Sequence, residues 1–385
     1  MTHFNYVEVL QLAGPETILT LAALAVLGAD LLFMRDDPAR YRRMVCAAFA
    51  GVGCVGAGLF LFAAHAHGVV SNGMLVLDPL TTIVKLALLV LTLFTVMISI
   101  DSDFTTHVGE YFALILMAAV GMLFMAGAEE ILMIFVALEL TSISLYVLGG
   151  FNKQDVKSSE AALKYFLVGG LSAAFTLYGL SLIYGLSGST NLRDIAAALQ
   201  GRGLDPLLIV ALVMTVIGFG FKIAAVPFHL WAPDAYEGAP TPSAALIASG
   251  SKVASFFLLA KVMMLGFAGV EGSGAWRAYV PGWVPTLGAL AALSMVMGNL
   301  AAIVQGSFKR LLAYSAIAHA GYMLLGVMSH DERGMASLVY YVATYGLATI
   351  GAFGVVAVLQ ERGGGDKLTD FAGLCQRAPR LALYL

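Results

Sequence analysis

Residues 131–150 read ILMIFVALELTSISLYVLGG, a stretch that is apolar except for Glu139 and a few hydroxyl groups. An apolar run of about twenty residues is the length that a helix needs to cross a bilayer. The whole chain is 60% hydrophobic and 12% charged, whereas soluble domains contain about 25% charged residues. The sequence therefore predicts an all-α, multi-pass membrane protein and argues against a soluble enzyme.

Apolar segments of similar length recur along the rest of the chain. The eleven predicted spans cover residues 15–34, 43–64, 78–100, 110–127, 131–150, 161–186, 206–226, 242–266, 284–304, 311–328 and 335–359. The first should be a helix of the mature protein, because Glu8 and Glu16 stand where a cleavable signal carries basic residues. Another apolar segment begins near Pro379, but the chain ends at Leu385, too soon to cross a bilayer. We therefore expect a truncated C-terminus.

Lys and Arg residues are unevenly divided between the two sets of predicted loops. Thirteen fall on one side and four on the other, while four more lie inside predicted helices. Because cytoplasmic loops are enriched in Lys and Arg, this bias predicts that the N-terminus lies outside. Residues 101–109 form a loop predicted to be cytoplasmic, yet they contain no Lys or Arg and add nothing to the assignment.

The charge and the cysteines exclude several kinds of site. A net charge of −3 gives no indication of a nucleic-acid partner. Cys46, Cys54 and Cys375 form no CxxC motif or Cys/His cluster, so the sequence predicts no metal site, haem attachment or disulfide framework. Cys46 and Cys54 lie in a Gly/Ala-rich run and are interpreted as small buried apolar residues.

Three ionisable residues fall near the middle of predicted spans: Glu139, Lys222 and Lys252. A charged side chain at that depth costs at least roughly 2.5–3.5 kcal/mol, so each one needs a compensating role. One hypothesis is an ion or proton pathway. The alternative is that a buried Glu–Lys pair only fixes the packing of two helices.

The predicted span that holds Lys222 also contains Pro227. Proline cannot donate the backbone hydrogen bond to the carbonyl of Ile223, so the helix should kink or break beside Lys222. Broken helices with ionisable residues at the break are a recurrent design of ion transporters. His229 follows Lys222 by about two turns and would share its face if the helix resumed, where it could carry a proton. We hypothesise that Lys222 keeps its proton when Glu139 is near and otherwise releases it toward His229 and Lys252.

Other ionisable residues in or beside the spans have simpler interpretations. Lys85 and Lys261 are interpreted mainly as anchors that extend toward the headgroups. Glu129 and Glu130 precede a predicted span and are interpreted as helix caps, because the helix dipole favours carboxylates there. His319 is interpreted as a packing histidine, with a functional role left open.

Two stretches resemble a known family. They are ALELTSISLYVLGGFNKQDVKSSEAALKYFLVGG at 137–170 and FGFKIAAVPFHLWAPDAYEGAPTPSAALIASGSKVA at 219–254. Both are similar to the antiporter-like membrane subunits of respiratory complex I, the proton-translocating NADH-quinone oxidoreductase, and most of all to its bacterial subunit N family. The resemblance implies proton translocation across a bacterial inner membrane, coupled to electron transfer from NADH to quinone in other subunits.

The resemblance also implies an architecture and a set of functional residues. It implies N-terminal helices in 1–109 and two inverted five-helix repeats, in 110–266 and from 284 onward. It assigns proton translocation to Glu139, Lys222, Lys252, His229 and Lys164, the last of which the composition alone places in a loop. Family members continue beyond this chain with a further broken helix that carries another lysine, so the second repeat is incomplete here.

The resemblance places the cofactors and partners outside this chain. It implies that NADH, FMN, iron-sulfur clusters and quinone bind to other subunits. The expected partners are neighbouring antiporter-like and small transmembrane subunits, together with the lipid bilayer. Rival readings are a subunit of a multi-subunit cation/proton antiporter, a homologous complex with another electron donor, and a scaffold whose buried charges only hold helices together.

Overall fold

The computed structural model describes residues 6–64 and 68–385 of the chain. Eleven helical segments in these residues are long and apolar enough to cross a membrane, which confirms the predicted multi-pass helical bundle. They are α2 (Gly14–Phe33), α3 (Ala39–Ala64), α4 (Pro79–Ser99), α5 (Val108–Gly127), α6 (Ile131–Gly149), α7 (Val156–Ser187), α9 (Pro206–Ile223), α11 and α12 (Thr241–Ala248 and Gly250–Lys261, continued by a π-helix at Val262–Gly266), α13 (Trp283–Ile303), α14 (Phe308–Met328) and α15 (Glu332–Glu361).

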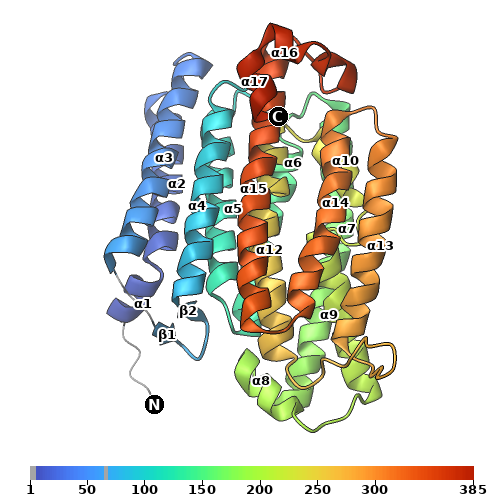
Figure 1. The fold of residues 1–385 in the computed structure, drawn as a ribbon. Coiled ribbons are helices and arrows are strands. Elements are labelled where there is room, and N and C mark those ends of the chain that lie inside the picture. The colour runs from blue at the N-terminus through green and yellow to red at the C-terminus, as the bar shows by residue number, and fades with distance from the viewer. Residues whose placement is uncertain (1–5, 65–67) are drawn as a thin grey trace.

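Shorter elements lie at the two ends of the bundle. They are α1 (Tyr6–Leu12), the antiparallel strands β1 (Gly68–Val70) and β2 (Leu75–Leu77), α8 (Leu192–Leu199), α10 (Trp231–Gly238), a 3-10 turn at Leu368–Phe371, α16 (Leu374–Arg377) and α17 (Pro379–Tyr384). Figure 1 shows α1, the two strands and α8 at one end, and α16 and α17 at the other. We call the end with α16 and α17 the basic end, because most of the predicted basic loops lie there. We call the end with α1, the two strands and α8 the opposite end.

Carboxylate side chains fix where many of the helices begin. Asp78, Glu130, Asp155, Asp205 and Asp331 each accept a hydrogen bond from a backbone N–H in the first turn of α4, α6, α7, α9 and α15, respectively. Such caps satisfy donors that the helix itself leaves free. The cap at Asp155 starts α7 five residues earlier than the predicted span. Lys164 lies inside α7, as the predicted span 161–186 already implies, so its assignment to a loop from composition alone is wrong.

The helices differ in how deeply they are buried. The span from Thr241 to Gly266 is buried except at Met264 and Leu265, which are partly exposed, and α5 is mostly buried. By contrast, most residues of α2, α7 and α13 are at least partly exposed, as expected for helices that face lipid or another subunit.

Two spans are interrupted. The helix predicted for 206–226 ends at Ile223, where Ala224 adopts a left-handed conformation with φ of 56°. This end is consistent with Pro227, because proline disrupts the turn that precedes it. The span predicted for 242–266 is divided at Ser249. Both interruptions lie beside a buried lysine.

Candidate functional site

Glu139 and Lys222 line the same small cavity between α6, α7 and α9. The cavity holds about 20 Å³, which is enough space for one water molecule. Lys222 is 5% exposed and donates a 2.7 Å hydrogen bond to the Ser142 hydroxyl, whereas Glu139 is partly buried. Ser142 lies three residues after Glu139, so both project from the same face of α6. Among the described residues, no direct ion pair joins Glu139 to Lys222. Both side chains line the cavity, which therefore lies between them.

Lys252 approaches Lys222 from the other side of the helix break. Its ammonium group donates a 2.6 Å hydrogen bond to the carbonyl of Ile223 and lies 5.6 Å from the centre of the Trp231 ring. Trp231 in turn donates to the carbonyl of Phe221. The last carbonyls of a helix have no partner within it and carry partial negative charge. The broken end of α9 therefore offers both buried lysines a favourable environment.

The structure does not support the geometric argument for His229. Helical geometry does not resume after Ile223, and His229 lies in the irregular segment before α10. The condition under which His229 would share a helical face with Lys222 is therefore not met. Its ring is partly buried, and its Nδ1 atom has no hydrogen-bond partner among the described residues. A role in proton transfer stays a prediction.

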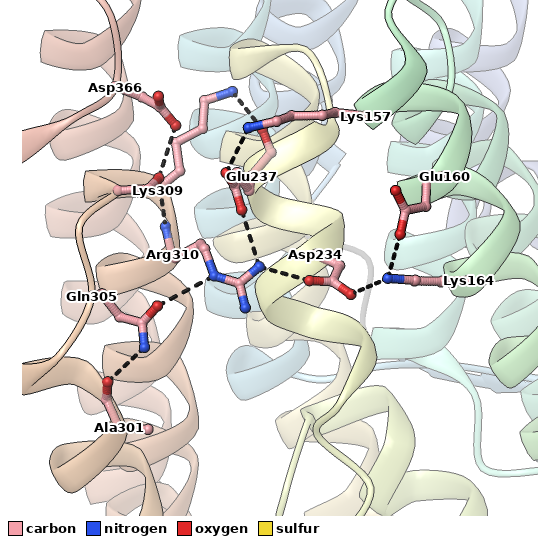
Figure 2. Close-up of polar contacts among 11 residues, drawn as sticks. Lys157, Glu160, Lys164, Asp234, Glu237, Ala301, Gln305, Lys309, Arg310 and Asp366 are labelled. Atoms are coloured by element: carbon pink, nitrogen blue, oxygen red, sulfur yellow. Dashed lines mark hydrogen bonds and ion pairs between the residues drawn. The ribbon is translucent and has the colours of Figure 1, made fainter.

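Lys164 lies at the basic end and belongs to a network of ion pairs. It contacts Asp234 at 2.6 Å and Glu160 at 2.7 Å. Arg310 lies 2.6 Å from Asp234 and 3.0 Å from Glu237. Figure 2 shows this network running from α7 through α10 to α14. Among the described residues, no direct hydrogen bond or ion pair joins Lys164 to the lysines at the break.

The sequence reasoning missed Asp234 and Glu237, which connect this network. They lie three residues apart in WAPDAYEG, so both project from one face of α10. Burial raises the pKa of the Asp234 carboxyl, but its hydrogen bonds and ion pairs with Lys164 and Arg310 outweigh this and hold it below the ordinary value of 3.8. Asp234 therefore stays ionised and ties α10 to both α7 and α14.

A wide pocket of about 610 Å³ opens beside this network. Acidic side chains line much of it, namely Asp101, Asp103, Asp155, Glu237, Glu361 and Asp366. Lys309 borders the pocket and donates to the backbone carbonyls of Glu237 and Ala239. The loop 101–109, which lacks basic residues, thus contributes acids to a negatively charged vestibule at the basic end.

Two lysines interpreted as headgroup anchors are instead buried in ion pairs. Lys85 is 1% exposed and lies 2.6 Å from Glu16, and Lys261 is 4% exposed and lies 3.5 Å from Glu129. The anchor interpretation is therefore wrong for both. Glu130 caps α6 as predicted, whereas Glu129 pairs with Lys261 and with Arg193 instead of capping the helix.

The remaining sequence interpretations concern packing. The ring of His319 lies 2.8 Å from the Tyr341 hydroxyl and packs beside Tyr322 and Tyr345, which fits a packing histidine. Cys46 and Cys54 are buried, which confirms their interpretation as small core residues. Within the described part of the chain, no three His, Cys, Asp or Glu residues are grouped to hold a metal ion.

Comparisons with known proteins place these features in a family. A profile described as "NADH:quinone oxidoreductase/Mrp antiporter, TM" matches residues 128–385. NADH-quinone oxidoreductase subunit N 2 of Acidobacterium capsulatum is 49% identical over 100% of this chain and 79% of the relative. A chain of respiratory complex I from Thermus thermophilus has a TM-score of 0.77 at 34% identity, covering 96% of this chain and 76% of that one. A chain of the Mrp complex from Dietzia has the same fold, with a TM-score of 0.77 at 18% identity over 97% of this chain and 69% of that one.

Proposed function

Because the chain belongs to the NADH:quinone oxidoreductase/Mrp antiporter transmembrane family, we propose that it translocates protons as a membrane subunit of NADH-quinone oxidoreductase. This membership confirms the resemblance predicted from the two quoted motifs. Electron transfer from NADH to quinone would take place on other subunits and drive the proton transfer here. The observation that carries the proposal is the pair of buried lysines at the broken end of α9, with Glu139 across a water-sized cavity.

The cavity between Glu139 and Lys222 gives the proposed switch its physical basis. Two unit charges about 7 Å apart attract by about 2 kcal/mol at an effective dielectric constant of about 20. A movement of α6 relative to α9 that changed this separation would change how firmly Lys222 holds its proton. The Ser142 hydroxyl orients the ammonium group beside the cavity, and one water there would connect it to the carboxylate.

Lys252 would receive the proton on the other side of the break. Lys222 and the acceptor of Lys252, the carbonyl of Ile223, are neighbours in sequence. Like charges held this close in a medium of low dielectric constant repel each other. Protonation of one lysine therefore disfavours protonation of the other. A single proton would thus move from Lys222 to Lys252. His229, with its unpartnered ring nitrogen, is proposed as a further carrier near this transfer.

Lys164 would act at the aqueous end of the path. It is 45% exposed and contacts Asp234 on α10, the short helix that follows the break. A change in the Lys164–Asp234 pair could therefore reposition the segment between α9 and α10. This gives the family lysine a role in linking the basic end to the break, in place of direct contact with Lys222.

The proposed architecture comprises N-terminal helices in 1–109, a first repeat in 110–266 and a second repeat from 284 onward. The family profile matches residues 128–385, which include most of the two proposed repeats. With the basic loops in the cytoplasm of a bacterium, the N-terminus would lie outside. The exposed apolar faces of α7 and α13 would contact lipid and neighbouring antiporter-like or small transmembrane subunits.

The alternative function is that of a cation/proton antiporter subunit, because the Dietzia Mrp chain has the same fold. Deleting the gene and restoring it on a plasmid distinguishes the two. Our proposal predicts that deletion abolishes NADH-driven proton uptake by inverted membrane vesicles, while sodium tolerance of the cells is unchanged. Sodium-sensitive growth with normal NADH-driven uptake would instead establish the antiporter.

A further inference from the structure

Four buried ionisable side chains meet at the end of the bundle away from the basic loops, and the proposed pathway does not use them. We call Glu16, Lys85, Glu129 and Lys261 the opposite-end cluster. Each is at most 4% exposed, and they come from α2, α4, the α5–α6 connection and α12. We propose that this cluster is a second proton-exchange site, which passes protons between the membrane interior and the water at the opposite end.

Both lysines of the cluster lie against the C-terminal end of α5. Lys261 donates a 3.0 Å hydrogen bond to the carbonyl of Ala126. The ammonium group of Lys85 lies 3.5 Å from the position that a Cβ atom would take at Gly127. Ala126 and Gly127 are the last two residues of α5, where the helix dipole favours cations. The Lys85–Glu16 and Lys261–Glu129 pairs therefore lie against the same end of α5.

One oxygen of the cluster has no partner. Glu16 Oε1 accepts the hydrogen bond from Lys85, while Oε2 is buried and has no hydrogen-bond partner in the described structure. Buried polar atoms in proteins are nearly always hydrogen-bonded, to the protein or to water. This oxygen is therefore a free acceptor for a water molecule or a proton inside the bundle.

The cluster also reaches the aqueous surface. Glu129 lies 3.2 Å from Arg193 on α8, and the Arg193 side chain is 68% exposed. Figure 1 shows α8 at the opposite end of the bundle. Glu129 thus links the buried Lys261 to an arginine that reaches the water at the opposite end.

The cluster is distinct from the site at the helix break. Lys252 and Lys261 belong to the same helix, α12, but are nine residues apart, about 13.5 Å and two and a half turns. They therefore project from opposite faces, Lys252 toward α9 and Lys261 toward α5. A π-helix begins directly after Lys261, and π-turns within helices are frequent at functional sites.

The proposed step conserves charge and atoms. The Lys261 ammonium group transfers one proton to the Glu129 carboxylate, leaving a neutral amine and a carboxylic acid. Glu129 then releases that proton to water beside Arg193. Water molecules deliver the next proton from Lys252 to the amine. This inference rests on the proposed function, because only a proton-translocating subunit would supply protons to Lys261.

The alternative is that the cluster has a purely structural role. Two variants distinguish the alternatives: one keeps the positive charge of Lys261, and the other removes both charges of the Lys261–Glu129 pair. Arginine keeps the positive charge but does not deprotonate in proteins. The Lys261→Arg variant should therefore form the ion pair yet fail to transfer protons. In the double variant Glu129→Gln/Lys261→Met, both charges are removed together, which commonly leaves stability almost unchanged.

The test measures NADH-driven proton uptake by inverted vesicles, normalised to the amount of assembled complex. Both Lys261→Arg and the double variant should lower uptake by roughly tenfold or more, the usual effect of removing a proton-transfer group. Arg202→Met is the matched control, because Arg202 forms an exposed ion pair with Asp205 near the same end, and it should behave as wild type.

Lys222→Met is measured in parallel to separate this inference from the proposed function. Wild-type uptake by the double variant, with uptake impaired in Lys222→Met, would overturn the opposite-end site alone. Normal uptake in Lys222→Met would overturn the proposed function as well. If Lys261→Arg does not assemble, the double variant still decides the question. If the double variant also fails to assemble, the cluster is structural and the inference is wrong.

Discussion

Replacing Ser142 by alanine tests how the buried ammonium group of Lys222 is held. In the described part of the chain, Lys222 donates its side-chain hydrogen bond to the Ser142 hydroxyl, at 2.7 Å. A hydrogen bond to a charged group contributes about 1.5–3 kcal/mol. Because about 1.4 kcal/mol corresponds to a factor of ten, loss of this hydrogen bond should weaken the hold on the ammonium group by roughly ten- to a hundredfold.

Coupled turnover should fall accordingly, if protonated Lys222 is an intermediate of the cycle. The assay is NADH oxidation together with proton uptake in inverted vesicles, corrected for the amount of assembled complex. Ser144→Ala is a closely matched control, because Ser144 is also on α6 and its hydroxyl also donates to the carbonyl four residues earlier, but it does not contact a lysine. Equal turnover in the two variants would refute the reasoning.

Two further predictions concern packing and the ion-pair network, and both use thermal unfolding of the detergent-solubilised complex. Gly121→Ala should destabilise the protein by about 1–3 kcal/mol, because the new Cβ atom would lie 2.7 Å from the backbone nitrogen of Thr141; Gly170→Ala, which has open space, should not. Asp234→Asn should destabilise by at most about 1 kcal/mol near neutral pH, since its ion pairs are partly exposed. The pKa of Asp234 is lowered in the folded state, so this stabilisation is present above its ordinary value of 3.8 and is lost as the pH falls through the lower, folded-state value. A difference in stability that grew toward acid pH would contradict that account.

The membrane spans could be predicted from the sequence because each depends only on a local run of apolar residues. Most predicted ends lie within a few residues of the observed ones. The exceptions arise where a side chain intervenes, as at Asp155, which starts α7 early, and at Pro227, whose effect ends α9 before the predicted residue. The short helices α8 and α10 were missed because they are too short and too polar to give a transmembrane signal.

The ionisable residues were harder to interpret, because their partners are distant in sequence. Lys85 and Glu16 are 69 residues apart, and Lys261 donates a hydrogen bond to the carbonyl of Ala126, which is 135 residues away. Depth within a predicted helix could suggest a headgroup anchor, but it could not reveal a partner on another helix. Asp234 could not be identified for the same reason, because its ion pairs with Lys164 and Arg310 form only where α7 and α14 lie beside α10.

Lys222 is the residue on which the account depends most directly. The decisive measurement is the NADH-driven proton uptake of inverted vesicles that carry Lys222→Met, alongside NADH oxidation, with the exposed Lys153→Met as the control. The account predicts that Lys222→Met either loses both activities or oxidises NADH with a lower proton yield, while Lys153→Met matches wild type. Wild-type oxidation and proton yield in a normally assembled Lys222→Met complex would contradict it.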